Sequence, residues 1–260
     1  EGSTTVASVS STLTGVHLTA SPLVLLVALS FLVPWASLAL KARKRWNLAV
    51  GRYLRRRLER AYGVRVLVYT GRLERARTFK LCRRISEVQS GQALVLVLDT
   101  RGGDIDAGAQ VARALAAHRG RVTVRVPDEC WSAGTIVACA ADDVLLGPHA
   151  NLGPTDAWAT FEPGMLYAAQ HLLAEETGVS LDTLRARAML RPTMQTITAV
   201  RVARGQDPTE AWALAERLTM QSDDHQRPIY ALEARELGLP VSVSRDPVWS
   251  EMMIRYGWSR

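Results

Sequence analysis

The stretch Ala93-Leu-Val-Leu-Val-Leu-Asp99-Thr-Arg-Gly-Gly-Asp104 decides the fold that the sequence predicts. Its six apolar residues are typical of a strand that is buried on both faces of a parallel sheet. The Gly102-Gly103 pair that follows permits a sharp turn in which backbone N–H groups converge on one point without a Cβ clash. The order predicted here is a strand, a tight turn and a helix.

The same alternation continues on both sides of this stretch. Runs that are apolar or β-branched predict strands over 64–70, 122–127 and 144–147. Helices are expected over 79–88, 107–118, 135–141 and 231–237, with further helices between 165 and 218. Repeated β-α-β units predict an α/β domain with a mainly parallel sheet and helices on both of its faces.

A second turn, Cys130-Trp-Ser-Ala-Gly-Thr-Ile136, also follows a predicted strand and precedes a helix. The N–H after a nucleophilic serine is a usual donor of an oxyanion hole, which makes Ser132 the candidate nucleophile. Gly103 and Ser132 are 29 residues apart, which fits one β-α-β crossover. Such a crossover would bring both turns to the same edge of the sheet.

The N-terminal region contains 19 uncharged residues, Pro22 to Leu40, enough to span about 30 Å as a helix. Lys41, Arg43, Lys44 and Arg45 follow directly. Because positive charge stays on the cytoplasmic side, we predict a single-pass anchor with its N-terminus outside and the following domain cytoplasmic. A cleaved signal peptide is the alternative, although it would have basic residues before the apolar run.

The predicted organisation has five parts, with membrane lipid contacting residues 22–60. These parts are a loose segment over 1–21, a transmembrane helix over 22–40, a basic juxtamembrane helix or linker over 41–62, a domain over 63–245 and a tail over 246–260.

Charge and cysteine content argue against several classes of protein. Residues 41–60 hold nine Lys/Arg and one acidic residue, so the rest of the chain has 23 basic against 24 acidic residues. This local block argues against nucleic-acid binding. Cys82, Cys130 and Cys139 have no metal-ligand spacing and are expected to be reduced thiols, as in the cytosol. No metal and no organic cofactor is expected.

Several motifs in order resemble the serine dehydrogenase proteinase family, membrane-anchored relatives of signal peptide peptidase A and of the Clp protease proteolytic subunit. The resemblance covers about residues 48–245 and rests on 99–104, 110–115, 121–127, 132–142, 147–156, 225–229 and 236–241. It implies the ClpP/crotonase fold, a repeated β-β-α/β-α-β core with C-terminal helices.

The resemblance also implies a site and a reaction. Ser132 takes the nucleophile position. The N–H groups of Ala133 and of one residue of the Gly102-Gly103 pair, with Gly103 preferred, take the oxyanion-hole positions. The implied reaction is hydrolysis of a peptide bond through an acyl-enzyme, in peptides or membrane proteins. The implied assembly is a homo-oligomer. An apolar face for it, or core positions instead, is expected at Leu172, Leu173, Leu184, Met189, Leu190, Met194 and Ile197.

The chain departs from the family at the general base that a serine nucleophile needs. Lysine is absent after Lys80, and the family's helix lysine falls near Arg191, which stays protonated. His225 is the candidate base, although Gln226 follows it where the family has aspartate. His149 and His171 are alternatives, because a triad is defined by geometry and not by chain order.

Two further substitutions, Arg101 in the first turn and Trp131 beside the serine, are expected to obstruct a substrate groove. The sequence therefore leaves two functions open, an anchored serine peptidase and a catalytically impaired pseudoprotease that serves as an oligomeric membrane-tethered scaffold or binding module. Acyl-thioester chemistry of the crotonase type is a third interpretation, for which the sequence shows no adenine- or pantetheine-binding signal.

Overall fold

The computed structural model describes residues 22–155, 158–162, 165–168, 181–220, 227–249 and 251–252, with side chains throughout except at 22–37, 158–168 and 181–189. The chain divides into two compact units, residues 1–46 and 47–260. Helix α1 (Pro22–Tyr62) begins in the first unit and ends in the second.

No helix in the described part of the chain is long and apolar enough to cross a membrane. The transmembrane helix predicted over 22–40 is therefore not supported. The prediction treated the uncharged residues as a separate segment, whereas helix α1 continues from them without a break through the basic block to Tyr62.

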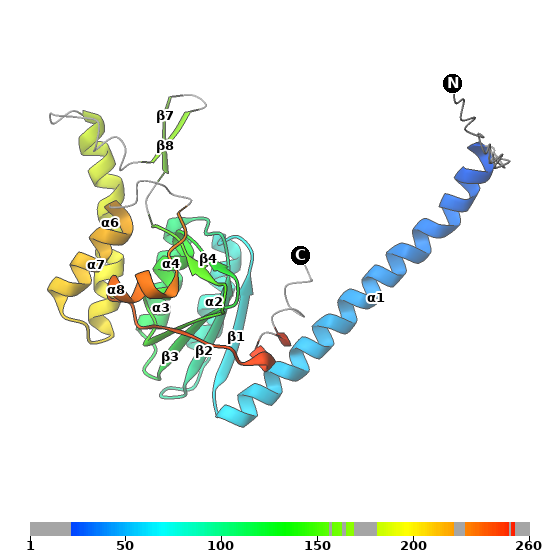
Figure 1. Ribbon diagram of the computed structural model, residues 1–260, viewed down its shortest axis with the longest axis horizontal. Helices are drawn as coiled ribbons and strands as arrows, with labels where there is room; N and C mark the ends of the chain where they lie inside the picture. The colour runs from blue at the N-terminus through cyan, green and yellow to red at the C-terminus, as the bar shows by residue number, and fades with distance from the viewer. Residues whose placement is uncertain are drawn as a thin grey trace, which may run out of the picture. The chain divides into compact units, whose positions relative to one another are not determined.

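The centre of the second unit is a five-stranded sheet in the order β1-β2-β3-β5-β9, in which every pair is parallel (Figure 1). Its strands are β1 (Arg65–Thr70), β2 (Leu94–Asp99), β3 (Val122–Val126), β5 (Asp143–Leu146) and β9 (Val241–Val243). All six residues of β2 are buried, as expected for the central apolar run of the sequence. The predicted α/β class with a mainly parallel sheet is confirmed.

The strands alternate with helices α2 (Arg75–Ser86), α3 (Ile105–Ala116) and α4 (Ala133–Ala138). These helices pack on one face of the sheet, where the larger core cluster includes Leu67, Leu96 and Leu98. The opposite face carries Val66 and Val97. Helices at the predicted positions therefore cover the face with the larger cluster. The opposite face is covered by other parts of the chain.

Two ends of the domain cover that second face. Leu58 from the last turns of α1 packs against it together with Trp249 and Met252. Trp249 also stacks under the buried Arg125 of β3, whose guanidinium carbon lies 4.8 Å from the ring centroid. Leu58, Trp249 and Met252 thus contribute to the domain core, although they lie in segments that were predicted to be a linker and a tail.

Short strands and C-terminal helices complete the domain. They are β4 (Glu129–Cys130), β6 (Asn151–Leu152), β7 (Trp158–Glu162), β8 (Met165–Ala168), α6 (Leu181–Ala203), α7 (Pro208–Met220) and α8 (Ala231–Glu236). β4 pairs in parallel with β6, and α6 packs against α7 (Figure 1). Gly238 with φ 94° ends the C-terminal turn at the predicted stop.

One prediction for this region is wrong, and one alternative is decided. The chain was expected to turn helical from Met165, but residues 165–168 form strand β8, which pairs antiparallel with β7 and places Tyr167 opposite Ala159. Aromatic residues such as Tyr167 have a high strand propensity. Leu190, Met194 and Ile197 were predicted for an oligomer face or for the core. They are at most 5% exposed because α6 packs them into the domain, which confirms the core alternative for these three. Leu172 and Leu173, and the side chains of Leu184 and Met189, lie outside the described residues.

Candidate active site

A parallel bridge between Thr100 and Cys130 brings the two glycine-bearing turns together. The Thr100 N–H donates to the Glu129 carbonyl at 2.9 Å, and the Trp131 N–H donates to the Thr100 carbonyl at 2.9 Å. This bridge extends β2 into β4 immediately before both turns. The crossover inferred from the 29-residue spacing therefore places Gly102 beside Ser132.

Gly102 has φ 93°, and a Cβ there would lie 2.9 Å from the Ser132 Cβ and 2.8 Å from the Trp131 carbonyl oxygen. Only glycine fits such a close approach at a positive φ. Gly134, two residues after the serine, meets the same restriction, since its Cβ would lie 2.5 Å from Thr100 Cγ2. The small residues of the two turns thus allow direct contact between them.

Ser132 has an uncommon backbone conformation, with φ 52° and ψ −118°. It is the only non-glycine residue with positive φ in the described part of the chain. Such conformations store about 1–3 kcal/mol of strain and cluster at functional sites. A sharp strand-to-helix turn of this kind presents the serine hydroxyl of α/β hydrolases.

The Ser132 side chain does not cap helix α4. Serine at the N-cap of a helix usually accepts a hydrogen bond from the first turn, but the Ser132 side chain makes no such bond to α4. By contrast, Asp104 caps α3 by accepting from the Ala107 N–H at 3.0 Å. The Ser132 hydroxyl is therefore free of a capping role.

The backbone N–H groups of the two turns differ in whether they already donate a hydrogen bond. The Gly102 N–H donates to the Thr100 hydroxyl at 3.0 Å. Within the described residues, no acceptor is found for the N–H of Gly103 or for that of Ala133, the first residue of α4. The geometry thus favours Gly103 over Gly102 as the second oxyanion donor beside Ala133.

Two substitutions that were expected to obstruct a groove are tied to neighbouring residues. Trp131 donates from Nε1 to the Asn151 side chain at 2.6 Å, and its ring packs so closely on Gly153 that a Cβ there would lie 2.9 Å away. The exposed Arg101 pairs with Glu129 at 2.7 Å. Both side chains therefore have structural partners at the rim of the turns.

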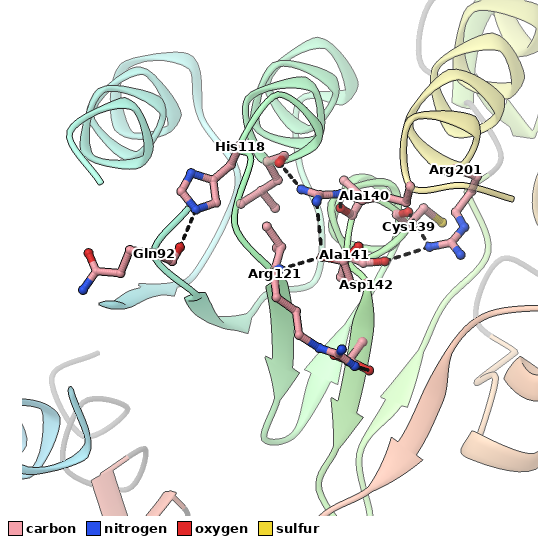
Figure 2. A network of polar contacts seen from close by, with 12 residues as sticks. Gln92, His118, Arg121, Cys139, Ala140, Ala141, Asp142 and Arg201 are labelled. Carbon is pink, nitrogen blue, oxygen red and sulfur yellow. Dashed lines mark hydrogen bonds and ion pairs between the residues drawn. The ribbon is translucent and has the colours of Figure 1, made fainter. Parts of the chain in front are cut away.

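Arg201 of α6 and Arg204, which follows that helix, bind the opposite end of α4. Figure 2 shows Arg201 reaching the carbonyl oxygens of Cys139 and Ala141, at 3.2 and 2.8 Å. Arg204 donates to the Ala140 carbonyl at 3.0 Å, pairs with Asp142 and also contacts the Leu115 carbonyl that ends α3. Cations at a helix C-terminus satisfy its free carbonyls and its dipole.

Sequence reasoning did not identify these arginines, because arginine in an amphipathic helix normally faces solvent. Arg201 is only 7% exposed, and burial lowers the pKa of its guanidinium. The sequence does contain one signal. Residues 133–141 form a small, apolar run, and no residue that could cap a helix C-terminus follows it. Such a helix needs donors from elsewhere in the fold.

The candidate bases are not assembled in the described part of the chain. His225 and His171 lie outside the described residues, and His149 is exposed in the loop before β6. Arg191, on α6, is exposed. His118 is buried and bonded through Nε2 to the Gln92 carbonyl at 2.7 Å (Figure 2), which gives it a structural role. No described side chain is hydrogen bonded to the Ser132 hydroxyl.

Cysteine does not offer a second nucleophile at this site. All three cysteines are free thiols, as predicted. Burial raises the pKa of Cys130, which is next to the serine turn, well above its usual value, and raises that of Cys139 to about 12. Both stay as neutral thiols at physiological pH and lack the thiolate that attacks carbonyls.

Known proteins resemble this chain at the level of sequence. The sequence profile of the ClpP-like SDH-type serine proteinases matches residues 63–256. The uncharacterised protein MJ0137 of Methanocaldococcus jannaschii is 28% identical over 170 residues, 64% of this chain and 59% of that protein. MJ1495, an uncharacterised protein of the same organism, is 25% identical over 209 residues, 73% of this chain and 70% of its own length. The chain thus spans about three-fifths of the first relative.

Solved structures show the same fold. Two structures of the 1510-N membrane-bound stomatin-specific protease, a serine-to-alanine mutant and a lysine-to-alanine mutant in complex with a substrate peptide, each superimpose with a TM-score of 0.51. They share 17% and 19% identity with this chain, cover 70% of it, and are themselves covered over 79% and 74%. With a profile match over three quarters of its length, the chain belongs to the family of ClpP-like SDH-type serine proteinases.

Proposed function

We propose that the chain is a serine peptidase in which the Ser132 hydroxyl attacks a peptide carbonyl and forms an acyl-enzyme that water then hydrolyses. The observation that carries the proposal is the Ser132 turn itself. A strained serine that makes no cap bond lies against Gly102, with the N–H groups of Gly103 and Ala133 available beside it.

Each feature has a role in this reaction. The negative charge that develops on the carbonyl oxygen in the tetrahedral intermediate would be stabilised by the Gly103 and Ala133 N–H groups. The α4 dipole, with its positive end at Ala133, adds to that stabilisation, although α4 is short. A base must take the serine proton as the Oγ–C bond forms and return it to the leaving amine.

For that base we propose His225, which aligns with the histidine of the family's His-Asp pair. Asp223 and Asp224 precede it and offer a carboxylate to orient the imidazole, in place of the residue at Gln226. This assignment rests on the sequence alone.

A fluorophosphonate probe tests this function without knowledge of the substrate. We expect the wild-type chain to be labelled and Ser132→Ala to be unlabelled. We also expect His225→Gln to reduce the labelling rate by 100-fold or more, since a general base typically contributes about 10²–10⁴. His149→Gln and His171→Gln are the matched controls and should label at the wild-type rate. A folded wild type that takes up no probe would contradict the proposal.

The second candidate function is that of a pseudoprotease that binds peptides or partners without hydrolysis. The absence of lysine after Lys80, together with the lack of a described side chain bonded to the Ser132 hydroxyl, favours it. The same labelling experiment separates the two, because an intact oxyanion hole without a base gives a serine that the probe does not modify.

We also propose that residues 22–60 attach the chain to a membrane. The support is the uncharged run followed by the basic block, and the membrane-bound character of the 1510-N protease. The chain of residues 1–260 should float with vesicles that contain anionic lipid, and a chain that begins at Asn47, which lacks the uncharged run and keeps only part of the basic block, should float much less. Equal flotation of the two chains, or none of the longer chain, would contradict this attachment.

A further inference from the structure

A cavity of about 600 Å³ lies between α2, α3, α4 and α6. Its wall includes Ile105, two residues after Gly103, and Ile136, four residues after Ser132. The Ile136 N–H approaches the Ser132 carbonyl at 3.3 Å, in the first turn of α4. Neither the serine nor the glycine pair lines the cavity, so its wall begins just beyond the two turns of the site.

The close packing of α3 on α4 ties this cavity to the site. A Cβ on Gly108 would lie 2.7 Å from the Ala133 carbonyl oxygen, so the two helices touch backbone to backbone at the serine turn. A peptide whose carbonyl rests on the Gly103 and Ala133 N–H groups would have side chains next to these helices. The cavity is large enough for any natural side chain, so its size alone does not select one.

The polar groups of the cavity are a better guide to its ligand. Arg75, Asp106 and Arg113 line it. Arg75 is engaged by two carboxylates, with Asp104 at 2.9 Å and Asp106 at 3.3 Å. Arg113 donates only to the Thr196 hydroxyl, at 3.2 Å, and has no carboxylate partner among the described residues. Arg113, which is itself exposed, is thus the guanidinium of the cavity that makes no ion pair among the described residues.

Thr193 provides a second, independent observation. It lines the cavity, is 2% exposed, and its hydroxyl oxygen has no hydrogen-bond partner in the described part of the chain. The other described hydroxyls near it on α6 are engaged, since Thr196 accepts from Arg113 and Thr198 donates to the Met194 carbonyl at 2.8 Å. Leaving a buried hydroxyl unpaired is unfavourable, so a ligand that bonds to it gains from the contact.

We propose that this cavity binds an acidic side chain of the peptide held at Ser132, with the carboxylate on Arg113 and Thr193. The aliphatic part of a glutamate would pack on Ile105 and Ile136, and its carboxylate would accept charge-assisted hydrogen bonds from the guanidinium and the hydroxyl. This inference rests on the proposed function for the position of the peptide, but its test does not require hydrolysis.

The test measures peptide binding to the full-length Ser132→Ala chain by fluorescence anisotropy. The probes are three fluorescein-labelled pools of degenerate pentapeptides that differ only in a fixed central residue, Glu, Gln or Lys. We expect the Glu pool to bind at least about tenfold more tightly than the others, because a carboxylate accepts charge-assisted hydrogen bonds that neither an amide nor an ammonium group can accept.

Two variants locate this preference. Arg113→Gln should abolish it, whereas Arg119→Gln, which changes an exposed arginine outside this cavity, should leave it unchanged. Thr193→Val keeps the shape of the side chain and removes the unpaired hydroxyl. It should weaken binding of the Glu pool several-fold while raising the thermal midpoint by about 2–4 °C.

The outcomes separate the subsite from the reaction. Equal binding of the Glu and Gln pools, binding of no pool, or a preference that survives Arg113→Gln would each overturn the subsite. If fluorophosphonate labels the wild type while the pools bind equally, the peptidase stands and the subsite fails. If the Glu preference appears without labelling, the subsite stands and the peptidase fails.

Discussion

The two ends of α4, a helix of only six residues, have opposite hydrogen-bonding environments. At the C-terminal end, Arg201 and Arg204 satisfy the carbonyls that follow the helix. At the N-terminal end, the first N–H has no acceptor among the described residues, the N-cap serine makes no cap bond, and its backbone is strained. The fold stabilises one end and leaves donors open at the other.

This difference separates stability from reactivity along one short helix. A six-residue helix is too short to persist through its own hydrogen bonds. The buried arginines at its far end and the complete burial of all six residues hold it in place. The strain and the free donors at Ser132 can then be maintained, because the surrounding structure determines the position of the turn.

The largest effect is expected from removing the support at the C-terminal end. Arg201→Met should lower the free energy of unfolding by about 3 kcal/mol, because two buried carbonyl oxygens lose their donor at about 1–3 kcal/mol each. Urea denaturation measures this. Arg191→Met, on the same helix but exposed, is the control and should change stability by less than about 0.5 kcal/mol. Equal effects of the two would mean that the buried guanidinium is not what holds α4.

A change of opposite sign is expected at the N-terminal end. Ser132→Gly should raise the free energy of unfolding by about 1–2 kcal/mol relative to Ser132→Ala, since glycine adopts a positive φ without strain and alanine does not. Both variants lack the hydroxyl, so the comparison isolates the backbone. If Ser132→Gly were less stable than Ser132→Ala, the strain assigned to this turn would be wrong.

The smallest effect on stability is expected at the N-terminus of α3. Asp104 caps this helix, whereas no side chain caps the N-terminus of α4. The N–H of Ala107 and the nearby Arg75 lower the pKa of Asp104, so its stabilisation is present above the unfolded pKa near 3.9 and is lost as pH falls through the lower folded value. Asp104→Ala should cost about 1 kcal/mol at pH 7, and the difference from wild type should shrink below about pH 4. Denaturation at pH 7 and pH 3 checks this, and a difference that does not depend on pH would contradict it.

The sequence predicted the local features of the fold well. The continuous run at 94–98 and the glycine pair after it specify a buried strand and a sharp turn, because few other structures accommodate those residues. It also predicted Ser132 as the nucleophile, with donors at Ala133 and in the Gly102-Gly103 pair, since these depend on residues adjacent in the chain. The resemblance already favoured Gly103 over Gly102, and the structure adds a physical reason, because the Thr100 hydroxyl occupies the Gly102 N–H.

The features that were missed depend on contacts distant in sequence. Arg201 reaches Ala141 across 60 residues, and nothing in its own helix shows that it is buried. Strand β8 was predicted to be helical because its apolar residues have no clear period of two. The cover on the second face of the sheet comes from both ends of the domain, Leu58 and Trp249, which no local pattern relates to one another.

The most direct test of the central claim is a crystal structure of the chain after reaction with a fluorophosphonate. The account predicts a phosphonyl group bonded to Ser132 Oγ, with its free oxygen about 2.7–3.1 Å from both the Gly103 and the Ala133 nitrogen atoms. An adduct whose oxygen lies away from these two N–H groups, or a folded chain that forms no adduct, would contradict the assignment of this turn as a working oxyanion hole.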